Sequence, residues 1–299
     1  MRPVTRLEEV ALEAGVSKST VSRVVNGGPY VSARARSAVL AAIDRLGYRP
    51  NQAARSLAGN RTDCVGLVVG DRSFDAGLAD LLRGVDTVLS GLGLRLVVST
   101  GASVDGVDGV LRVGGGGVPA GVPVVSFGHA VGVPYVAVDD FSGGVAAVRH
   151  LVGRGRRRIA AIAGGGDVDR LNGWYRGMGR AGLSADLVVR AEADPASGAR
   201  AMSVLLSSEP GLDGVFVGSD VLAYGALEVL RTRGLGVPSD VAVVGFGDLP
   251  SSSVVGLTAV RPDHESLGRS AAHLMATVLS GSPVPPFTLV PPSLVLRST

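Results

Sequence analysis

The stretch that decides the fold of the N-terminal part occupies residues 10–27 and reads VALEAGVSKSTVSRVVNG. Four apolar side chains around its start have the i, i+3, i+4, i+7 spacing of one helical face: Leu7, Val10, Ala11 and Ala14. Gly15 is expected to end this helix, and Ser17 offers an N-cap for a second helix that runs through Val25. Two helices joined by a short glycine turn are typical of a helix-turn-helix.

A third helix is predicted after residues 27–29, Gly-Gly-Pro, which are expected to interrupt the helical structure. Ser32 is its expected N-cap and Gly47 its end, and four residues form the inner face: Val39, Leu40, Ile43 and Leu46. Pro50 and Asn51 then open a short, weakly apolar segment that reaches about Leu57. Because Gly and Asn follow at 59–60, we place the end of an all-α helix-turn-helix head at residue 61.

The charge of this head differs from that of the remaining chain. Residues 1–61 contain ten Lys and Arg against four Asp and Glu, a balance of +6, whereas residues 62–299 have 19 against 22, a balance of −3. Lys18 is the single lysine of the protein and lies at the start of the second helix. A small basic head on a mildly acidic body indicates that the head meets a polyanion.

Composition excludes several other classes of protein. With 46 % hydrophobic and 18 % charged residues, the 299-residue chain is not disordered as a whole. No stretch approaches the ~18 uninterrupted apolar residues of a membrane span. The first nine residues turn acidic where a signal peptide needs an apolar run, and Cys64 alone makes no internal disulfide. We therefore expect a soluble cytoplasmic protein.

From Cys64 onward, short β-branched runs alternate with helical patterns. Strands are predicted at 65–69, 94–99, 109–113, 122–127, 158–163, 214–217 and 241–245, and helices at 76–92, 142–153, 196–208, 221–233 and 265–279. This alternation predicts parallel α/β sheets. Because about 240 residues is long for one sheet, residues 62–299 are expected to form two subdomains with a cleft between them. The first comprises about 62–157 plus 264–289, and the second 158–263 plus 290–299.

Two connections in the first subdomain are too short for the helices that normally cover a parallel sheet. Only residues 100–108 and 114–121 link the strands predicted at 94–99, 109–113 and 122–127, and a parallel crossover usually needs a dozen or more residues. One face of this sheet is therefore expected to lack two helices. Either the strands are shortened or another subunit covers them, and the cleft is shallower there. The alternative is that residues 114–117 and their neighbours fold back over the sheet.

The amino-acid sequence closely resembles the sequences of the lac-repressor (LacI-type) transcription regulators. The resemblance is most specific in the head, at residues 10–27, 31–32, 46–51 and 54–57. It continues through the core at residues 66–69, 123–125, 173–174, 219–220, 225–227, 237–241, 243–248 and 291–295. It implies a homodimeric repressor on a pseudo-palindromic operator, with a periplasmic-binding-protein-like core in which a small, sugar-like molecule changes the affinity for DNA.

The candidate DNA contacts lie in the second helix and in the segment after the third. Lys18 and Ser19 begin the recognition helix, where side chains reach base edges, and Arg23 follows one turn later. Short polar side chains suited to phosphate contacts are Ser17, Thr20, Ser22 and Asn26. Residues 51–57 resemble the hinge helix that lies in the minor groove, which adds Asn51, Ala54, Arg55 and Leu57, with Leu57 as the wedge that kinks the duplex.

The candidate effector contacts follow the strands of the core, where ligands of parallel sheets bind. Several lie just beyond predicted strands: Ser73, Phe74, Asp75, His129, Ser219, Asp220 and Asp248. Arg170 stands three residues before Gly173-Trp174, where the family places an arginine that grips the effector. A guanidinium there suits a carboxylate or paired hydroxyls.

Some family contacts are changed in this sequence. The usual Ile-Asp-Arg is replaced by residues 127–129, Phe-Gly-His, the frequent aromatic platform aligns near Ala193, and the first acidic position of Gly-Phe-Asp-Asp is Gly247. These changes indicate an unusual effector or a pocket without function. A dimer whose core no longer responds to any effector therefore remains an alternative.

The sequence contains no motif for catalysis, metal binding or cofactor binding with the surrounding elements or spacing that such a site needs. Residues 177–182 spell a Gly-x-Gly-x-x-Gly fingerprint, but they end a helix instead of joining a strand to one. The four histidines lack metal-ligand spacing, and no Gly-x-Ser-x-Gly elbow occurs. We therefore expect no enzyme activity, no metal and no cofactor. A transport-type solute-binding protein shares the core fold, but the head and the lack of a signal peptide argue against it.

Overall fold

The computed structural model describes residues 6–25, 28–48, 61–70, 76–101, 103–114 and 120–299. The chain forms two compact units, Met1–Asp63 and Cys64–Thr299, which divide two residues after the predicted boundary. Within the described residues, no helix has both the length and the apolar character needed to cross a lipid bilayer.

The head contains three helices: α1 (Leu7–Ala14), α2 (Lys18–Val25) and α3 (Ala33–Leu46). Gly15 and Gly47 end α1 and α3 with φ of 63° and 60°, a left-handed conformation that glycine adopts without a steric penalty. Ser32 caps α3 by accepting a hydrogen bond from the Ala35 amide. The predicted glycine ends of the first and third helices and the Ser32 cap are therefore present, whereas α1 begins after Arg6 without a side-chain cap.

The core of the head is built from small and β-branched side chains of the three helices. Its buried members are Val10, Ala11, Val21, Val24, Val39, Ala42 and Tyr48. The assignment of Leu40 to the inner face was wrong, because its side chain is 55 % exposed. Ala42, three residues after Val39, is buried instead, since a helix returns to the same face after three or four residues.

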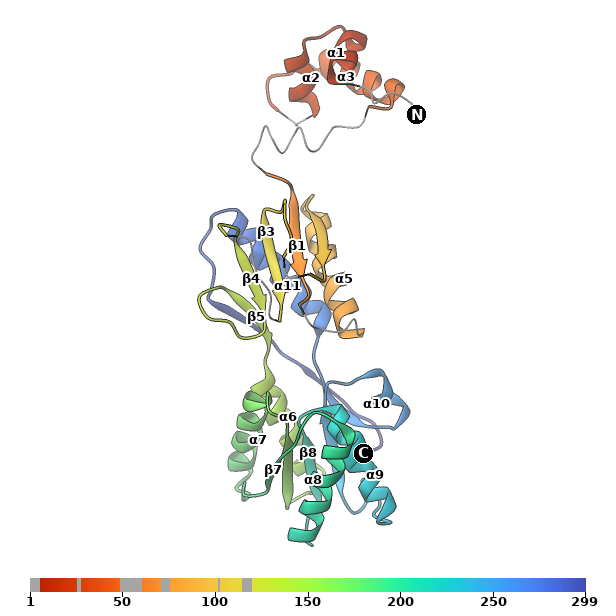
Figure 1. Ribbon diagram of the computed structural model, residues 1–299, viewed down its shortest axis with the longest axis vertical. Coiled ribbons are helices and arrows are strands. Elements are labelled where there is room, and N and C mark those ends of the chain that lie inside the picture. The colour runs from red at the N-terminus through yellow and green to blue at the C-terminus, as the bar shows by residue number, and fades with distance from the viewer. Residues whose placement is uncertain (1–5, 26–27, 49–60, 71–75, 102, 115–119) are drawn as a thin grey trace. The chain divides into compact units, whose positions relative to one another are not determined.

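The first sheet of the core unit is wholly parallel, with the strand order β11-β5-β4-β3-β1-β2. Its strands are β1 (Cys64–Val68), β2 (Arg95–Ser99), β3 (Gly109–Val113), β4 (Val124–Phe127), β5 (Tyr135–Val138) and β11 (Phe287–Val290). Two helices, α5 (Ala76–Gly91) and α11 (His264–Leu279), cover one face of this sheet. Figure 1 shows both on the same side of the strands.

The second sheet has the order β12-β10-β9-β8-β6-β7 and departs from the predicted parallel arrangement at one edge. Its strands are β6 (Ile159–Ala163), β7 (Val188–Arg190), β8 (Gly214–Val217), β9 (Ala242–Phe246), β10 (Thr258–Arg261) and β12 (Ser293–Val295). The pair β10–β12 is antiparallel, and the other four pairs are parallel. An antiparallel edge strand on a parallel sheet is common in α/β folds.

The helices of the second subdomain cover both faces of its sheet (Figure 1). They are α6 (Asp140–Gly153), α7 (Val168–Ala181), α8 (Pro195–Ser208), α9 (Asp220–Thr232) and the short α10 (Pro250–Val254). The pairs α6–α7 and α8–α9 pack closely against each other. Buried valine, leucine, alanine and isoleucine side chains fill the space between helices and strands.

The structure corrects the expected subdomain of α6. The predicted boundary places residues 62–157, and with them α6, in the first subdomain. In the structure, Ala147, Val148 and Leu151 of α6 pack against Trp174 and Met178 of α7 in the core of the second subdomain. The apolar face of α6 therefore decides its place, and the chain changes subdomain before α6 begins, between residues 138 and 140.

The face of the first sheet opposite α5 and α11 has no helix in the described residues. Neither connection forms a helix in residues 100–101, 103–108, 114 or 120–123. Val104 of the first connection lies instead over Gly66 of β1 and is only 8 % exposed, with Val68 and Val110 fully buried beside it. Cover by residues 114–117 falls partly outside the described residues, and cover by a second subunit stays a prediction.

We predict that Gly66→Ala destabilises the core unit by about 1–3 kcal/mol, because the new methyl group would overlap a methyl group of the stiff Val104 side chain. Urea unfolding measures the change. Combining it with Val104→Ala should cost less than the sum of the two single changes. Gly91→Ala, with open space around the added atom, is the matched control. Strictly additive effects would contradict the packing of residue 104 on the sheet.

Candidate functional site

The exposed face of α2 is polar, and its inner face is apolar. Val21 and Val24 are buried in the head, whereas Lys18, Ser19 and Arg23 are exposed. Since both valines are pinned by α1 and α3, the exposed side chains of α2 are fixed in direction. This geometry fits a recognition helix, whose outer side chains reach the edges of bases.

Ser17 caps α2 and lies within hydrogen-bond distance of two neighbouring hydroxyl groups. Its Oγ accepts a hydrogen bond from the Thr20 amide at 3.2 Å and lies 2.8 Å from both Ser19 Oγ and Thr20 Oγ1. N-capping is therefore one role of Ser17, and phosphate binding stays a prediction. Ser22 is half-buried.

Lys18 is in contact with an acidic residue of α1, a pairing that the sequence does not predict. Its Nζ donates a hydrogen bond to Glu8 Oε1 in the first turn of α1. This bond is the largest cause that lowers the pKa of Glu8, so the carboxylate stays ionised. A second pair, Arg45 and Glu13, joins α3 to α1 at 3.0 Å.

Five of the candidate DNA contacts fall outside the described residues: Asn26, Asn51, Ala54, Arg55 and Leu57. Their roles, including the wedge assigned to Leu57, stay predictions.

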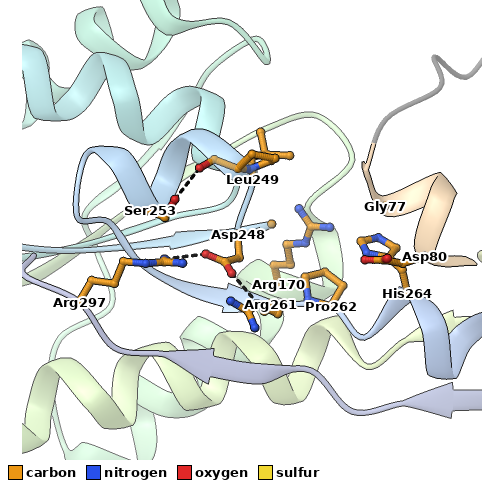
Figure 2. A pocket seen from close by; sticks show the side chains of 12 residues that line it. Gly77, Asp80, Arg170, Asp248, Leu249, Ser253, Arg261, Pro262, His264 and Arg297 are labelled. Atoms are coloured by element: carbon orange, nitrogen blue, oxygen red, sulfur yellow. Dashed lines mark hydrogen bonds and ion pairs between the residues drawn. The ribbon is translucent and has the colours of Figure 1, made fainter.

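The core unit holds a cavity of about 510 Å³ between its two subdomains (Figure 2). The first subdomain contributes Gly77, Asp80 and His264, and the second contributes Arg170, Gly247, Asp248, Leu249, Pro250, Ser253, Arg261, Pro262 and Arg297. A cleft of this size suits a small molecule. Among the predicted effector residues that the structure describes, only Arg170 and Asp248 line it.

Arg170, in the first turn of α7, is held by several partners at once. Its Nη1 donates to the Gly218 carbonyl oxygen at 2.7 Å and lies 3.2 Å from Asp167 Oδ1. Its Nε is 3.3 Å from Asp140 Oδ2, and its guanidinium lies 4.0 Å from the centre of the Phe246 ring. Burial raises the pKa of Asp140, although the Arg170 charge opposes the rise. These contacts fix the guanidinium at the cleft wall.

Asp248 holds two arginines at the floor of the cavity. Its side chain is 3 % exposed, with Oδ2 2.5 Å from Arg261 Nε and Oδ1 2.6 Å from Arg297 Nη1 (Figure 2). Burial raises the pKa of Asp248, but the hydrogen bonds and charges of the two arginines outweigh it and lower the pKa below its usual value. The φ of Asp248 is 52°, a strained conformation for a non-glycine residue, which the two ion pairs hold in place.

Ser219 and Asp220 do not line this cavity. Ser219 caps α9 by accepting from the Leu222 amide, and Asp220 is 1 % exposed. Asp220 Oδ2 accepts from the Leu249 amide at 2.8 Å and from Ser252 Oγ at 2.6 Å. Burial raises the pKa of this carboxyl group. The expectation that Asp220 faces the cleft was therefore wrong: it anchors the segment that carries α10.

The remaining candidates are not gathered at the cavity either. His129 does not line it, since its Nε2 lies 3.2 Å from Asp169 Oδ2 and its ring packs on Tyr135. Ser73, Phe74 and Asp75 fall outside the described residues. Arg261 and Arg297 are not predicted from the sequence, because their partner Asp248 is 13 and 49 positions away. Among the described residues, no group of three or more His, Cys, Asp or Glu side chains is arranged to hold a metal ion.

Comparison with known proteins identifies both parts of the chain. Residues 6–51 match bacterial regulatory proteins of the lacI family, and residues 148–299 match the periplasmic binding protein-like domain. The chain is 39 % identical to the HTH-type transcriptional regulator CelR of Thermobifida fusca. Their alignment, 321 positions long with its gaps, covers 95 % of this chain and 94 % of that protein. The chain belongs to the lacI family.

Other lacI-family proteins agree with this assignment. GalR of Escherichia coli (strain K12) is 32 % identical over 97 % of this chain and 94 % of its own. A CelR–cellobiose complex superposes with a TM-score of 0.68 at 36 % identity, covering 98 % of this chain and 99 % of that one. The lac repressor dimer bound to operator and the anti-inducer ONPF superposes with a TM-score of 0.77 at 27 % sequence identity, and the match covers 99 % of both chains.

The predicted family and fold class are thereby confirmed. The protein is a DNA-binding transcription regulator with a helix-turn-helix head and an α/β core of two subdomains. The matched relatives are named as transcription regulators and not as enzymes.

We predict that Asp248→Asn destabilises the core by about 2 kcal/mol at neutral pH, because two arginines lose their carboxylate partner while Arg261, half exposed, is partly compensated by water. Since the pKa of Asp248 is lowered in the folded state, its contribution is complete above about pH 4 and is lost as the pH falls below that value. Urea unfolding at neutral and acid pH measures the difference.

The control is Glu228→Gln, which breaks the exposed pair with Arg231 and should leave the stability nearly unchanged, because water screens an exposed ion pair. Equal stability of Asp248→Asn and the wild type at neutral pH would refute the structural role of the two ion pairs.

Proposed function

We propose that the protein is a repressor that binds a pseudo-palindromic DNA operator as a homodimer, and that a small, sugar-like molecule in the cleft changes its affinity for DNA. The observation that carries the proposal is the exposed face of α2, where Lys18, Ser19 and Arg23 project from a helix fixed by buried valines. The lac repressor structure that is similar to this chain is a dimer bound to operator.

Dimerisation is needed because one head offers few base contacts. Two heads related by two-fold symmetry read two half-sites, so their base contacts add on one DNA molecule. The excess of basic residues in 1–61 supplies the sequence-independent attraction to phosphates. Because such a regulator acts where the chromosome lies, the proposal places the protein in the cytoplasm, and it includes no enzyme activity.

The cleft is proposed as the effector site. Arg170 and the polar groups of Ser253 and Asp80 line a cavity of suitable size between the two subdomains. A ligand that contacts both subdomains favours one of their relative arrangements, and a conformational preference of this kind is how an effector changes DNA affinity. The CelR structure that is similar to this chain is a complex with cellobiose.

A core without effector response is the second candidate, and the cleft geometry favours it in one respect. The charged groups that could bind hydroxyls are already occupied: Asp248 by Arg261 and Arg297, and Arg170 by Asp167 and the Gly218 carbonyl. Gly247 adds no side chain at the position where the family pattern has an acidic residue. A ligand screen separates the two candidates.

We predict that the full-length protein protects a palindromic site near its own gene in a footprinting experiment. Its affinity should fall about a thousandfold between about 50 and 200 mM salt, because arginines displace counterions. Lys18→Ala should relax the base preference at one position in each half-site, at a cost of about 1–3 kcal/mol. If no palindrome is protected upstream of any neighbouring gene, the repressor function is rejected.

We predict that a thermal-shift screen against sugars, nucleosides and sugar phosphates yields a ligand that stabilises the core by mass action. Calorimetry with that ligand should find its affinity reduced by about 1.5–3 kcal/mol in Arg170→Ala, which removes a charge-assisted contact. Arg180→Ala, an exposed arginine in the last turn of the same helix, serves as the control. Unchanged affinity in Arg170→Ala would reject the cleft assignment, and a screen without any ligand would favour the unresponsive core.

A further inference from the structure

The contact between Glu8 and Lys18 places a carboxylate on the surface that the proposed function assigns to DNA. Glu8 is the second residue of α1 and Lys18 the first of α2, so the pair bridges the two helices of the helix-turn-helix. Both side chains are exposed, Lys18 by 64 % and Glu8 by 58 %. The lowered pKa of Glu8 keeps the carboxylate charged at neutral pH.

Stability does not account for this pair. An ion pair this exposed contributes little, since water screens it and two flexible side chains must be ordered. A carboxylate in the first turn favours the positive N-terminal end of α1, but Glu9 in the same turn already supplies that charge. A negative charge beside the start of α2 also weakens attraction to phosphates. The position of Glu8 is therefore better explained by contact with a base.

We propose that Glu8 and Lys18 together read one G·C base pair in each half-site. Lysine donates hydrogen bonds to guanine O6 and N7, and a carboxylate accepts one from the cytosine N4 amino group. The ammonium group has three N–H donors. One is used by Glu8 Oε1, which leaves two for the two guanine acceptors. A carboxylate has lone pairs on both oxygens, so Glu8 can accept from cytosine N4 while it keeps its bond with Lys18.

An A·T pair satisfies the same two side chains less completely. In the major groove, the adenine amino group lies between two acceptors, which are adenine N7 on one side and thymine O4 on the other. With Glu8 on the amino group, the ammonium reaches N7 alone, and one of its N–H groups loses a partner. A carboxylate that faces thymine O4 meets a second acceptor, which is repulsive. Glu8 thus adds discrimination that lysine alone would not provide.

The test compares Glu8→Ala with Glu9→Ala in the full-length protein, by selecting sites from a randomised operator library. The two changes remove the same charge from the same helical turn, so both should raise affinity for random DNA equally. Only Glu8→Ala should lose preference for G·C, by about tenfold at one position in each half-site. Thermal unfolding of both variants checks that the head stays folded.

Modified bases locate the contacts atom by atom. A 7-deazaguanine at that position should weaken the wild type and Glu8→Ala but leave Lys18→Ala unchanged. A pyrimidine without the N4 amino group should weaken the wild type and Lys18→Ala but leave Glu8→Ala unchanged.

Two results would overturn the inference: identical site preferences of Glu8→Ala and Glu9→Ala, or selection of A·T by the wild type at the affected position. The inference rests on the proposed function, and the two fail differently. A wild-type protein that selects no site at all rejects both, whereas a selected palindrome with no effect of Glu8→Ala rejects only the reading by Glu8.

Discussion

Close contact between paired helices at glycine is the constraint on which the core depends. In α6–α7, a Cβ atom on Gly144 would collide with the Arg170 carbonyl oxygen, and one on Gly173 with that of Phe141. The pairs α5–α11 and α8–α9 have the same reciprocal arrangement, at Gly84 with Gly268 and at Gly198 with Gly225. Because no side chain separates the backbones, each pair packs as one unit on its sheet. The contact at Gly144 also fixes the backbone of Arg170, so helix packing sets the position of the guanidinium in the cleft.

Charge pairing then determines what the cleft presents. Asp248 is buried and binds two arginines, one at the end of β10 and one in the C-terminal segment. Asp220 is also buried, and it accepts hydrogen bonds from the segment of α10. Both carboxylates thus stabilise the floor of the cavity, because a buried charge without partners is costly. The cavity lining therefore carries both donors and acceptors of hydrogen bonds: the guanidinium groups of Arg170, Arg261 and Arg297, the Asp80 carboxylate, the Ser253 hydroxyl and the His264 imidazole.

The first subdomain shows how a parallel sheet can lose helical cover and keep its central strands buried. Gly66 leaves room for Val104, and Val68 and Val110 are fully buried around it. Among the described residues, Val104 and the partly buried Val107 and Val122 of the connecting segments pack over the middle of the face, whereas edge positions such as Val97 and Phe287 are 38 % and 49 % exposed. Apolar side chains are therefore buried on strands that have neighbours on both sides and are partly exposed on the edge strands.

The sequence by itself determined the elements that depend on local patterns. The head helices, their caps at Ser32 and Gly47, and the buried strands β1, β6 and β8 follow from apolar periodicity, capping chemistry and short β-branched runs. The family resemblance added the arginine of the cleft. Five strands were missed, because three or four residues carry little periodicity: β5, β7, β10, β11 and β12. Only the tertiary structure decided that α6 joins the second subdomain, that Asp220 turns inward and that Glu8 meets Lys18. Each of these depends on which distant surface a side chain finds, and spacing along the chain does not encode that.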